Sequence, residues 1–167
     1  MNQSQSAVGS LSRLTRTIVF GCLVAAAGLL PQGATAQANP RLGTWTLNVA
    51  KSTYQQGQAP ATETRTYLAT DDGGVQMTAD AVLPSGTKQP SGYRAKFDGK
   101  DAPYSGAGGD TIAITGDGWA SDATIKSIGK VTQTTHSVVS KDGMTMTLVT
   151  KTASGRAIST RIYNKQM

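Results

Sequence analysis

Arg161 and Tyr163 are the clearest pair of functional side chains in this sequence, two positions apart near its end. A guanidinium group forms paired, charge-assisted hydrogen bonds to a carboxylate, and a phenol adds one more donor. Because alternate residues of a β-strand face the same side, both side chains can point to one place. The pair is therefore a candidate carboxylate-binding site, with a plain surface position as one alternative.

Other chemistry-bearing residues form no recognisable constellation. His136 is the single histidine, whereas a metal site needs three or four ligands. There is no G-x-S-x-G nucleophile motif, and Gly106–Gly109 lacks the following Lys-Ser/Thr of a phosphate-binding loop. Asp and Glu fall largely in turns, where Asp is favoured. We therefore expect no metal, no cofactor and no enzymatic activity.

Residues 1–36 have the three parts of a secretory signal peptide. Met1–Arg16 carries cations and no acid, Thr17–Leu30 carries no charge, and small residues in A-x-A order follow. We expect cleavage after Ala36 or Ala38, which leaves a mature chain of single-domain length. The predicted location is the bacterial periplasm or the outside of the cell.

The N-terminal segment has two alternative interpretations, a membrane anchor and a lipoprotein signal. A membrane anchor needs about 20 apolar residues, more than Thr17–Leu30 supplies. A lipoprotein would be acylated at Cys22, after Val19-Phe20-Gly21, but most of the apolar run would then stay on the mature protein. Cys22 is the only cysteine, so the mature domain has neither thiol nor disulfide, which suits an oxidising compartment.

The charge pattern argues against a nucleic-acid partner. The whole chain has a net charge of +6, and removal of Arg13 and Arg16 with the signal peptide lowers it to about +4. The remaining cations are scattered, whereas a nucleic-acid surface concentrates them beside aromatic residues. No stable membrane span is expected after cleavage.

From Leu42 onward the chain alternates apolar residues with threonines and is punctuated by Gly and Asp. Asp-Gly pairs favour tight hairpin turns, and alternation of this kind is typical of strands. The pattern predicts strands at about 43–50, 62–70, 75–83, 92–98, 101–105, 110–115, 119–126, 129–140, 143–152 and 156–164. Short links and the cost of exposed edges favour one all-β domain, a single antiparallel up-and-down barrel of eight to ten strands over residues 42–167. Residues 37–41 are expected to form a flexible lead, and the long connection Lys51–Thr62 a lid or an irregular link.

Two end motifs resemble known families. Leu42-Gly43-Thr44-Trp45 is similar to the G-x-W motif of lipocalins and fatty-acid-binding proteins, and Thr160–Lys165 to the closing R-x-Y strand of the latter. The sequence pattern of residues 42–165 resembles that of exported bacterial lipocalin-like (calycin-type) domains of unknown function. The chain departs from the fatty-acid-binding pattern at Lys51–Thr62, which is too short for the helix pair those proteins insert there.

The resemblance implies roles for particular side chains. Arg161 and Tyr163 would point inward and hold a carboxylate; the structural alternative is that Arg161 packs on Trp45 and caps the barrel floor. Trp119 follows a glycine turn, where it would contact a ligand at the cavity mouth. The expected apolar ligand contacts are Trp45, Met77, Phe97 and Met146; alternatively, such residues simply fill a small barrel.

These features predict an exported, non-enzymatic, lipocalin-like protein that binds a small apolar or amphipathic ligand inside its barrel. The alternative is a packed barrel that acts through its outer surface as an envelope interaction or inhibitor module. A cavity of roughly 300 Å³ or more reached by Arg161 and Tyr163 would favour ligand binding, whereas a filled interior beside an exposed apolar patch would favour the alternative.

Overall fold

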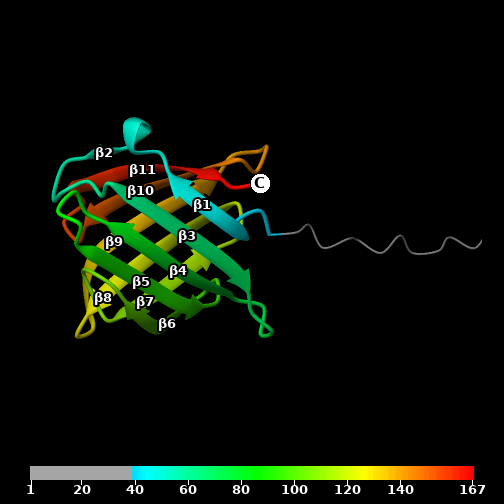
Figure 1. Ribbon diagram of the computed structural model, residues 1–167. Coiled ribbons are helices and arrows are strands. Elements are labelled where there is room, and N and C mark those ends of the chain that lie inside the picture. Colours follow the sequence, from blue (N-terminus) through cyan, green and yellow to red (C-terminus); the bar gives the residue numbers. More distant parts are fainter. Residues whose placement is uncertain (1–38) are drawn as a thin grey trace, which may run out of the picture. The chain divides into compact units, whose positions relative to one another are not determined.

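The computed structural model describes residues 39–167 (Figure 1). The predicted signal peptide over residues 1–36 lies outside the described residues, as do the two alternatives for that segment, the membrane anchor and acylation of Cys22. Within residues 39–167, no helix is long and apolar enough to cross a membrane.

The described chain is a succession of strands joined by short turns. Their bounds are β1 Gly43–Leu47, β2 Thr53–Tyr54, β3 Thr62–Ala69, β4 Val75–Val82, β5 Lys88–Ala95, β6 Asp98–Ser105, β7 Thr111–Gly116, β8 Ala120–Ser127, β9 Lys130–Val139, β10 Thr145–Thr152 and β11 Ala157–Lys165. One 3₁₀ helix, η1 (Val49–Lys51), follows β1. Turn chemistry explains the punctuation: at Gly143 the φ angle of +72° is one that Gly adopts freely, and the Asp142 carboxylate accepts the backbone N–H of Met144.

The sheet closes on itself. Of its eleven strands, the two-residue β2 pairs only with β11, and the other ten run antiparallel from β1 through β3 to β11. Strands β1 and β11 complete the ring, with Trp45 opposite Lys165 and Leu47 opposite Tyr163. The predicted all-β, antiparallel, up-and-down barrel is confirmed (Figure 1). Closure removes the exposed edges of the sheet.

The largest difference from the predicted strands is in β5, which begins at Lys88 rather than at residue 92. The polar run around Pro90 gave no strand signal, because Pro cannot donate a ladder hydrogen bond. Strand β5 tolerates it because β6 pairs with β5 only at Gly92 and Tyr93. At Pro90 the strand therefore has one neighbour, β4, and behaves as an edge.

Alternation sends one set of side chains inward. The main apolar cluster consists of Trp45, Leu47, Tyr67, Met77, Ala79, Val139, Met146, Leu148 and Tyr163. A second, smaller cluster consists of Ala95, Ile112, Ile114 and Ile125. Strand β11, whose inward face the sequence left ambiguous, turns Ser159 and Tyr163 inward, while Ile158 is an extra residue in a β-bulge opposite β10.

Candidate functional site

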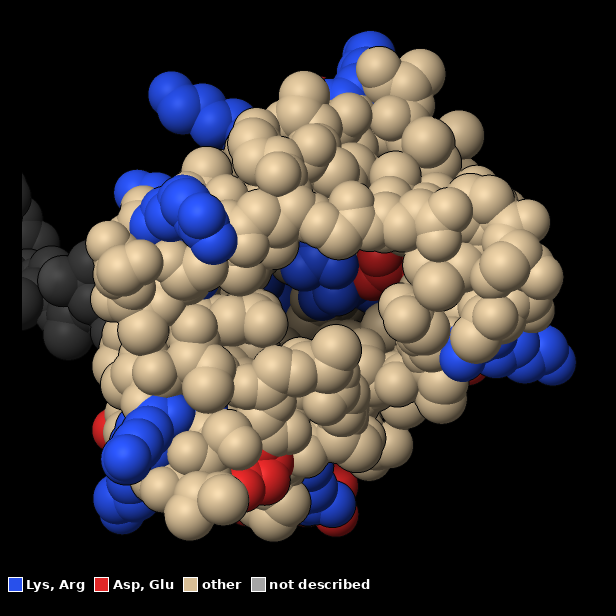
Figure 2. All heavy atoms as spheres, turned by 90° about the vertical axis from the view of Figure 1, so that its left-hand side faces the viewer, with Lys and Arg blue, Asp and Glu red and all other residues tan. Residues whose placement is uncertain are grey.

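The barrel contains a cavity of about 290 Å³ that is open at one end. Figure 2 looks into this mouth, where Lys or Arg atoms and Asp or Glu atoms are visible at the bottom of the opening. Exposed residues of the lining, Gln58, Gln89, Pro90 and Ala107, belong to the rim. The predicted lid or link Lys51–Thr62 contributes Gln58 together with Tyr54, Gln56 and Pro60.

Small inward side chains leave the barrel hollow. Inward positions that a packed core would fill with Leu or Phe hold Ser91, Ser121, Ser137, Ser159, Thr135, Thr150, Ala81 and Ala123, and all of these line the cavity. Ser121 and Ser159 are buried from outside solvent, with exposed fractions of 5% and 4%. Because a hydroxyl or methyl group occupies far less volume than a branched side chain, the ring of strands encloses space rather than a packed core.

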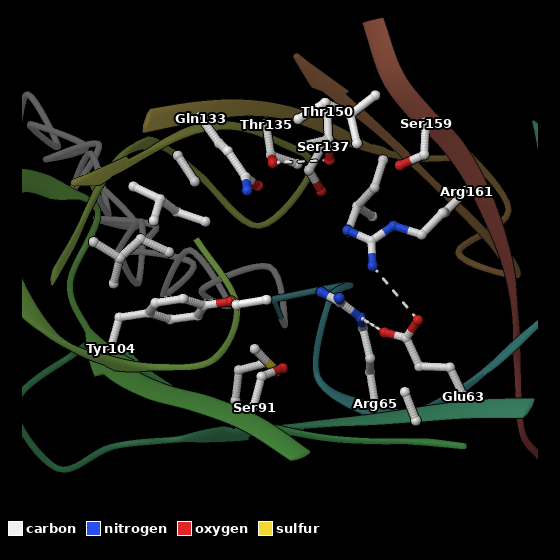
Figure 3. Close-up of a pocket in the computed structure, with 18 of the residues that line it drawn as sticks. Glu63, Arg65, Ser91, Tyr104, Gln133, Thr135, Ser137, Thr150, Ser159 and Arg161 are labelled. Carbon is white, nitrogen blue, oxygen red and sulfur yellow. Dashed lines mark hydrogen bonds and ion pairs between the residues drawn. The ribbon is translucent and has the colours of Figure 1, made fainter. Parts of the chain in front are cut away.

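The cavity wall has two chemical sides. Strands β7 and β8 contribute a mainly apolar side made of Ile112, Ile114, Ala123 and Ile125, with Ser121 as its polar member. Strands β9, β10 and β11 contribute a polar side made of Gln133, Thr135, Ser137, Thr150, Ser159 and Arg161 (Figure 3). A wall of this kind suits a molecule with an apolar body and polar groups.

Glu63 lies between two arginines in the cavity wall. Glu63 and Arg65 alternate on β3 and so share its inward face. Arg65 Nε donates to Glu63 Oε1 at 2.6 Å, and Arg161 Nη1 from β11 lies 3.5 Å from Glu63 Oε2 (Figure 3). The side chains meet because β1, which separates β3 from β11, ends at Leu47. The cluster therefore has a surplus of one positive charge.

Electrostatics keep this cluster ionised. Burial by itself would raise the pKa of Glu63, but the positive charges of Arg65 and Arg161 and the Arg65 hydrogen bond lower that pKa to about 2. Glu63 in turn raises the pKa of Arg65 against the effect of burial. The Arg65 guanidinium also stacks over the Tyr163 ring at 5.2 Å. Arg161 Nε is buried and has no hydrogen-bond partner.

Arg41 is a third arginine in the cavity lining. It falls in the segment for which the sequence predicted a flexible lead, yet only 3% of its surface is exposed. Its carbonyl oxygen accepts the Trp45 indole N–H at 2.8 Å, and its Nη1 donates to Ser137 Oγ at 2.6 Å. The turn before the G-x-W motif thus places a cation inside the barrel.

The structure distributes the predicted site residues over three environments. Arg161 and Met77 line the cavity. Trp45, Met146 and Tyr163 are completely buried in the main apolar cluster, outside the cavity lining.

Trp119 and Phe97 are half-buried and also lie outside the cavity lining. Trp119 packs against the main cluster and Phe97 against the smaller one. The Trp119 carbonyl accepts the backbone N–H of Val139 on β9, so Trp119 lies beside Val139. Gln133 of the cavity lining is six residues from Val139 on the same strand, a distance of about 20 Å. Trp119 therefore lies toward the end of the barrel remote from Gln133.

The cation over Trp45 is Lys165 rather than Arg161, which corrects the structural role that the resemblance offered for Arg161. Lys165 Nζ lies 5.2 Å from the centre of a Trp45 ring and donates to the Pro40 carbonyl. Lys165 is the direct strand partner of Trp45, whereas Arg161 lies beyond the paired segment of β1. Arg161 is thereby free to face Glu63.

His136 lies on the outer surface, where its ring pairs with the Asp122 carboxylate at 2.8 Å. Among residues 39–167, no group of three or more His, Cys, Asp or Glu side chains is placed to hold a metal ion. The cavity lining itself contains one carboxylate, Glu63, and neither His nor Cys.

Comparisons with known proteins identify the fold. No family model matches the chain, and no curated protein does. Among solved structures, a single-residue mutant of the fluorescent protein UnaG aligns with a TM-score of 0.56 and 14% identity over 77% of this chain and 97% of that one. Wild-type UnaG aligns with a TM-score of 0.48 and 13% identity, over 75% of this chain and 96% of that one. The barrel thus has a lipocalin-like and fatty-acid-binding-protein-like fold.

Proposed function

We propose that this protein is an exported, non-enzymatic binding protein whose barrel holds a small amphipathic acid. The observation that carries the proposal is a hollow interior in which a surplus of positive charge faces an apolar wall. A carboxylate beside Arg161 would balance the surplus charge of the cluster. The apolar body would lie against the β7 and β8 isoleucines.

The cavity favours ligand binding over the packed-barrel alternative, because a filled interior leaves no space for a ligand. Its volume of about 290 Å³ is close to the lower bound for small-molecule sites. The lining also lacks a nucleophile and base arrangement, since its single carboxylate is bound to two arginines. The signal-peptide pattern of residues 1–36 supports export.

The test is calorimetric titration of the purified protein with dodecanoate, with dodecan-1-ol as the neutral control of equal chain length. We expect dodecanoate to bind more tightly than the alcohol, and Arg161→Met to weaken dodecanoate binding by about tenfold, the effect of losing roughly one charge-assisted contact. Arg94→Met, on the outward face of β5, is the matched control and should bind like the wild type. Absence of dodecanoate binding to the wild type would refute the proposal.

A further inference from the structure

Arg41 lines the cavity, and two of its three guanidinium nitrogens have no hydrogen-bond partner. Its Nη1 donates to Ser137 Oγ and lies 3.9 Å from Met146 Sδ. Its Nε and Nη2 are buried and have no hydrogen-bond partner. An arginine with only 3% of its surface exposed rarely leaves two donors unused, because nothing replaces the lost hydration. An acidic group bound in the cavity beside Arg41 would compensate this buried charge.

Contacts hold both the backbone and the guanidinium of Arg41. The Asn39 side chain accepts the Arg41 backbone N–H at 3.0 Å, and the Trp45 indole holds the Arg41 carbonyl. The guanidinium lies over the Tyr67 ring at 5.8 Å. These contacts hold the donors in place before any ligand arrives, which lowers the entropy cost of binding.

The charges of the cavity lining do not balance. Arg41, Arg65 and Arg161 face a single carboxylate, Glu63, which leaves a surplus of two positive charges. Asp117 feels the charge of Arg41, but it is exposed, and none of the ion pairs within 4.0 Å among residues 39–167 joins it to Arg41. Its Oδ1 accepts the backbone N–H groups of Trp119 and Ala120.

Tyrosine ionisation does not supply the missing negative charge. Burial raises the pKa of Tyr93, which stands near Arg41 and Arg65 in the cavity wall, far enough to keep its phenol neutral. Burial likewise raises the pKa of Tyr163 beside Arg65. The two uncompensated cations therefore remain for a bound molecule to neutralise.

We propose that the ligand is a doubly acidic molecule, and that Arg41 binds its second acidic group. The inference rests on the proposed function and names the ligand class of the same cavity. Arg161 pairs with Glu63 and Arg41 stacks on Tyr67, and these two β3 residues are four positions apart, about 13 Å along the strand. That spacing fits two separate carboxylates on an apolar body better than one phosphate group.

The test compares dicarboxylates with monocarboxylates of equal length, from hexanedioate to dodecanedioate and from hexanoate to dodecanoate, by calorimetry at neutral pH. We expect the best dicarboxylate to bind the wild type at least about tenfold more tightly than its monocarboxylate partner. Arg41→Met should abolish that difference by weakening dicarboxylate binding more than monocarboxylate binding. Arg94→Met, an outward-facing control, should keep the difference.

The outcomes separate this inference from the proposed function. If monocarboxylates bind as tightly as every dicarboxylate, the proposal of a second acidic group is wrong, but the proposed function is not contradicted. Failure of both series overturns both. If the Arg41→Met variant does not fold, the wild-type protein can be tested instead by NMR of the Arg41 side-chain Nε–H resonance. This resonance should shift when the best dicarboxylate binds and should not shift with its monocarboxylate partner. An unshifted resonance at saturation overturns the inference.

Discussion

Glu63 compensates the positive charges of two buried arginines in the cavity wall, Arg65 and Arg161. Its carboxylate is bound by Arg65 and Arg161, and only 4% of its side chain is exposed. Replacement by an isosteric amide keeps the shape and removes the charge. We expect Glu63→Gln to lower the free energy of unfolding by about 3 kcal/mol at neutral pH, because it leaves two buried cations facing each other. Urea unfolding measures this change, and a loss below about 1 kcal/mol would contradict it.

The same carboxylate predicts an acid-dependent loss of stability. Its pKa is about 2 in the folded protein and near 4.5 when unfolded, so its stabilising contribution is complete above pH 4.5 and disappears as the pH falls toward 2. A shift of this size corresponds to about 3 kcal/mol. The unfolding free energies of wild type and Glu63→Gln should therefore converge between pH 4.5 and 2. Parallel curves across that range would show that Glu63 is not the responsible group.

At the residue scale, the sequence pattern predicts Arg161 as a site residue but not its partners. Glu63, Arg65 and Tyr67 alternate on one face of a Thr-rich strand, and this phase was available in the sequence. Charged residues at inward positions contradict the usual apolar pattern, so they gave no core signal. Arg41 was not predictable in this way, since its burial depends on the turn that connects it to Trp45.

At the element scale, alternation predicted the strands because one face of each strand is buried. The same alternation also indicates the cavity. Ser121 of β8, together with Ser137 and Thr150, occupies positions that alternate in phase with the apolar core residues. Small polar residues at inward positions indicate a hollow barrel. The alternation of apolar residues by itself is compatible with both a filled and a hollow interior.

Strand β8 offers a way to fill the cavity. Ser121→Leu adds a branched side chain at an inward lining position, where it should occupy ligand space and weaken dodecanoate binding at least about tenfold, the loss of roughly 1.4 kcal/mol. Thr134→Leu, on the exposed face of β9, adds the same kind of side chain outside the barrel and should leave binding unchanged. Equal binding by both variants would place the ligand elsewhere.

The β8–β9 hairpin contains the one non-glycine residue with positive φ in the described chain. Ile128 has a φ of +49°, a left-handed conformation that is strained for a β-branched residue, and it is 90% exposed. Neither a favourable backbone conformation nor burial therefore explains an isoleucine at this position. Two-residue hairpin turns favour Asn before Gly, as Gly129 would allow. Ile128→Asn should raise the free energy of unfolding by about 1 kcal/mol. Ile128→Val keeps the β-branched side chain and should give no such gain in a urea titration.

At the scale of the whole molecule, the barrel has to be stable without covalent cross-links. Closure joins β1, near the start of the described chain, to β11, near its end. The buried cluster that contains Trp45 and Tyr163 therefore depends on residues far apart in sequence. The sequence predicted this closure through its end motifs. It did not predict the bulge at Ile158 or the end of β1 at Leu47, which together shape the cavity wall.

Export makes a prediction for the intact protein. If the proposed export holds, the full chain produced in a bacterial host and purified from the periplasm or medium should have the mass of a chain that begins at Gln37 or Asn39, because the A-x-A sites precede these residues. The mature chain then lacks Cys22, so a thiol reductant should not change its melting temperature. An intact mass that retains residues 1–36 would contradict cleavage, and a lipid adduct at Cys22 would support the lipoprotein alternative. Cleavage at either predicted site keeps Arg41 in the mature chain, so the processed protein retains every cation of the cavity.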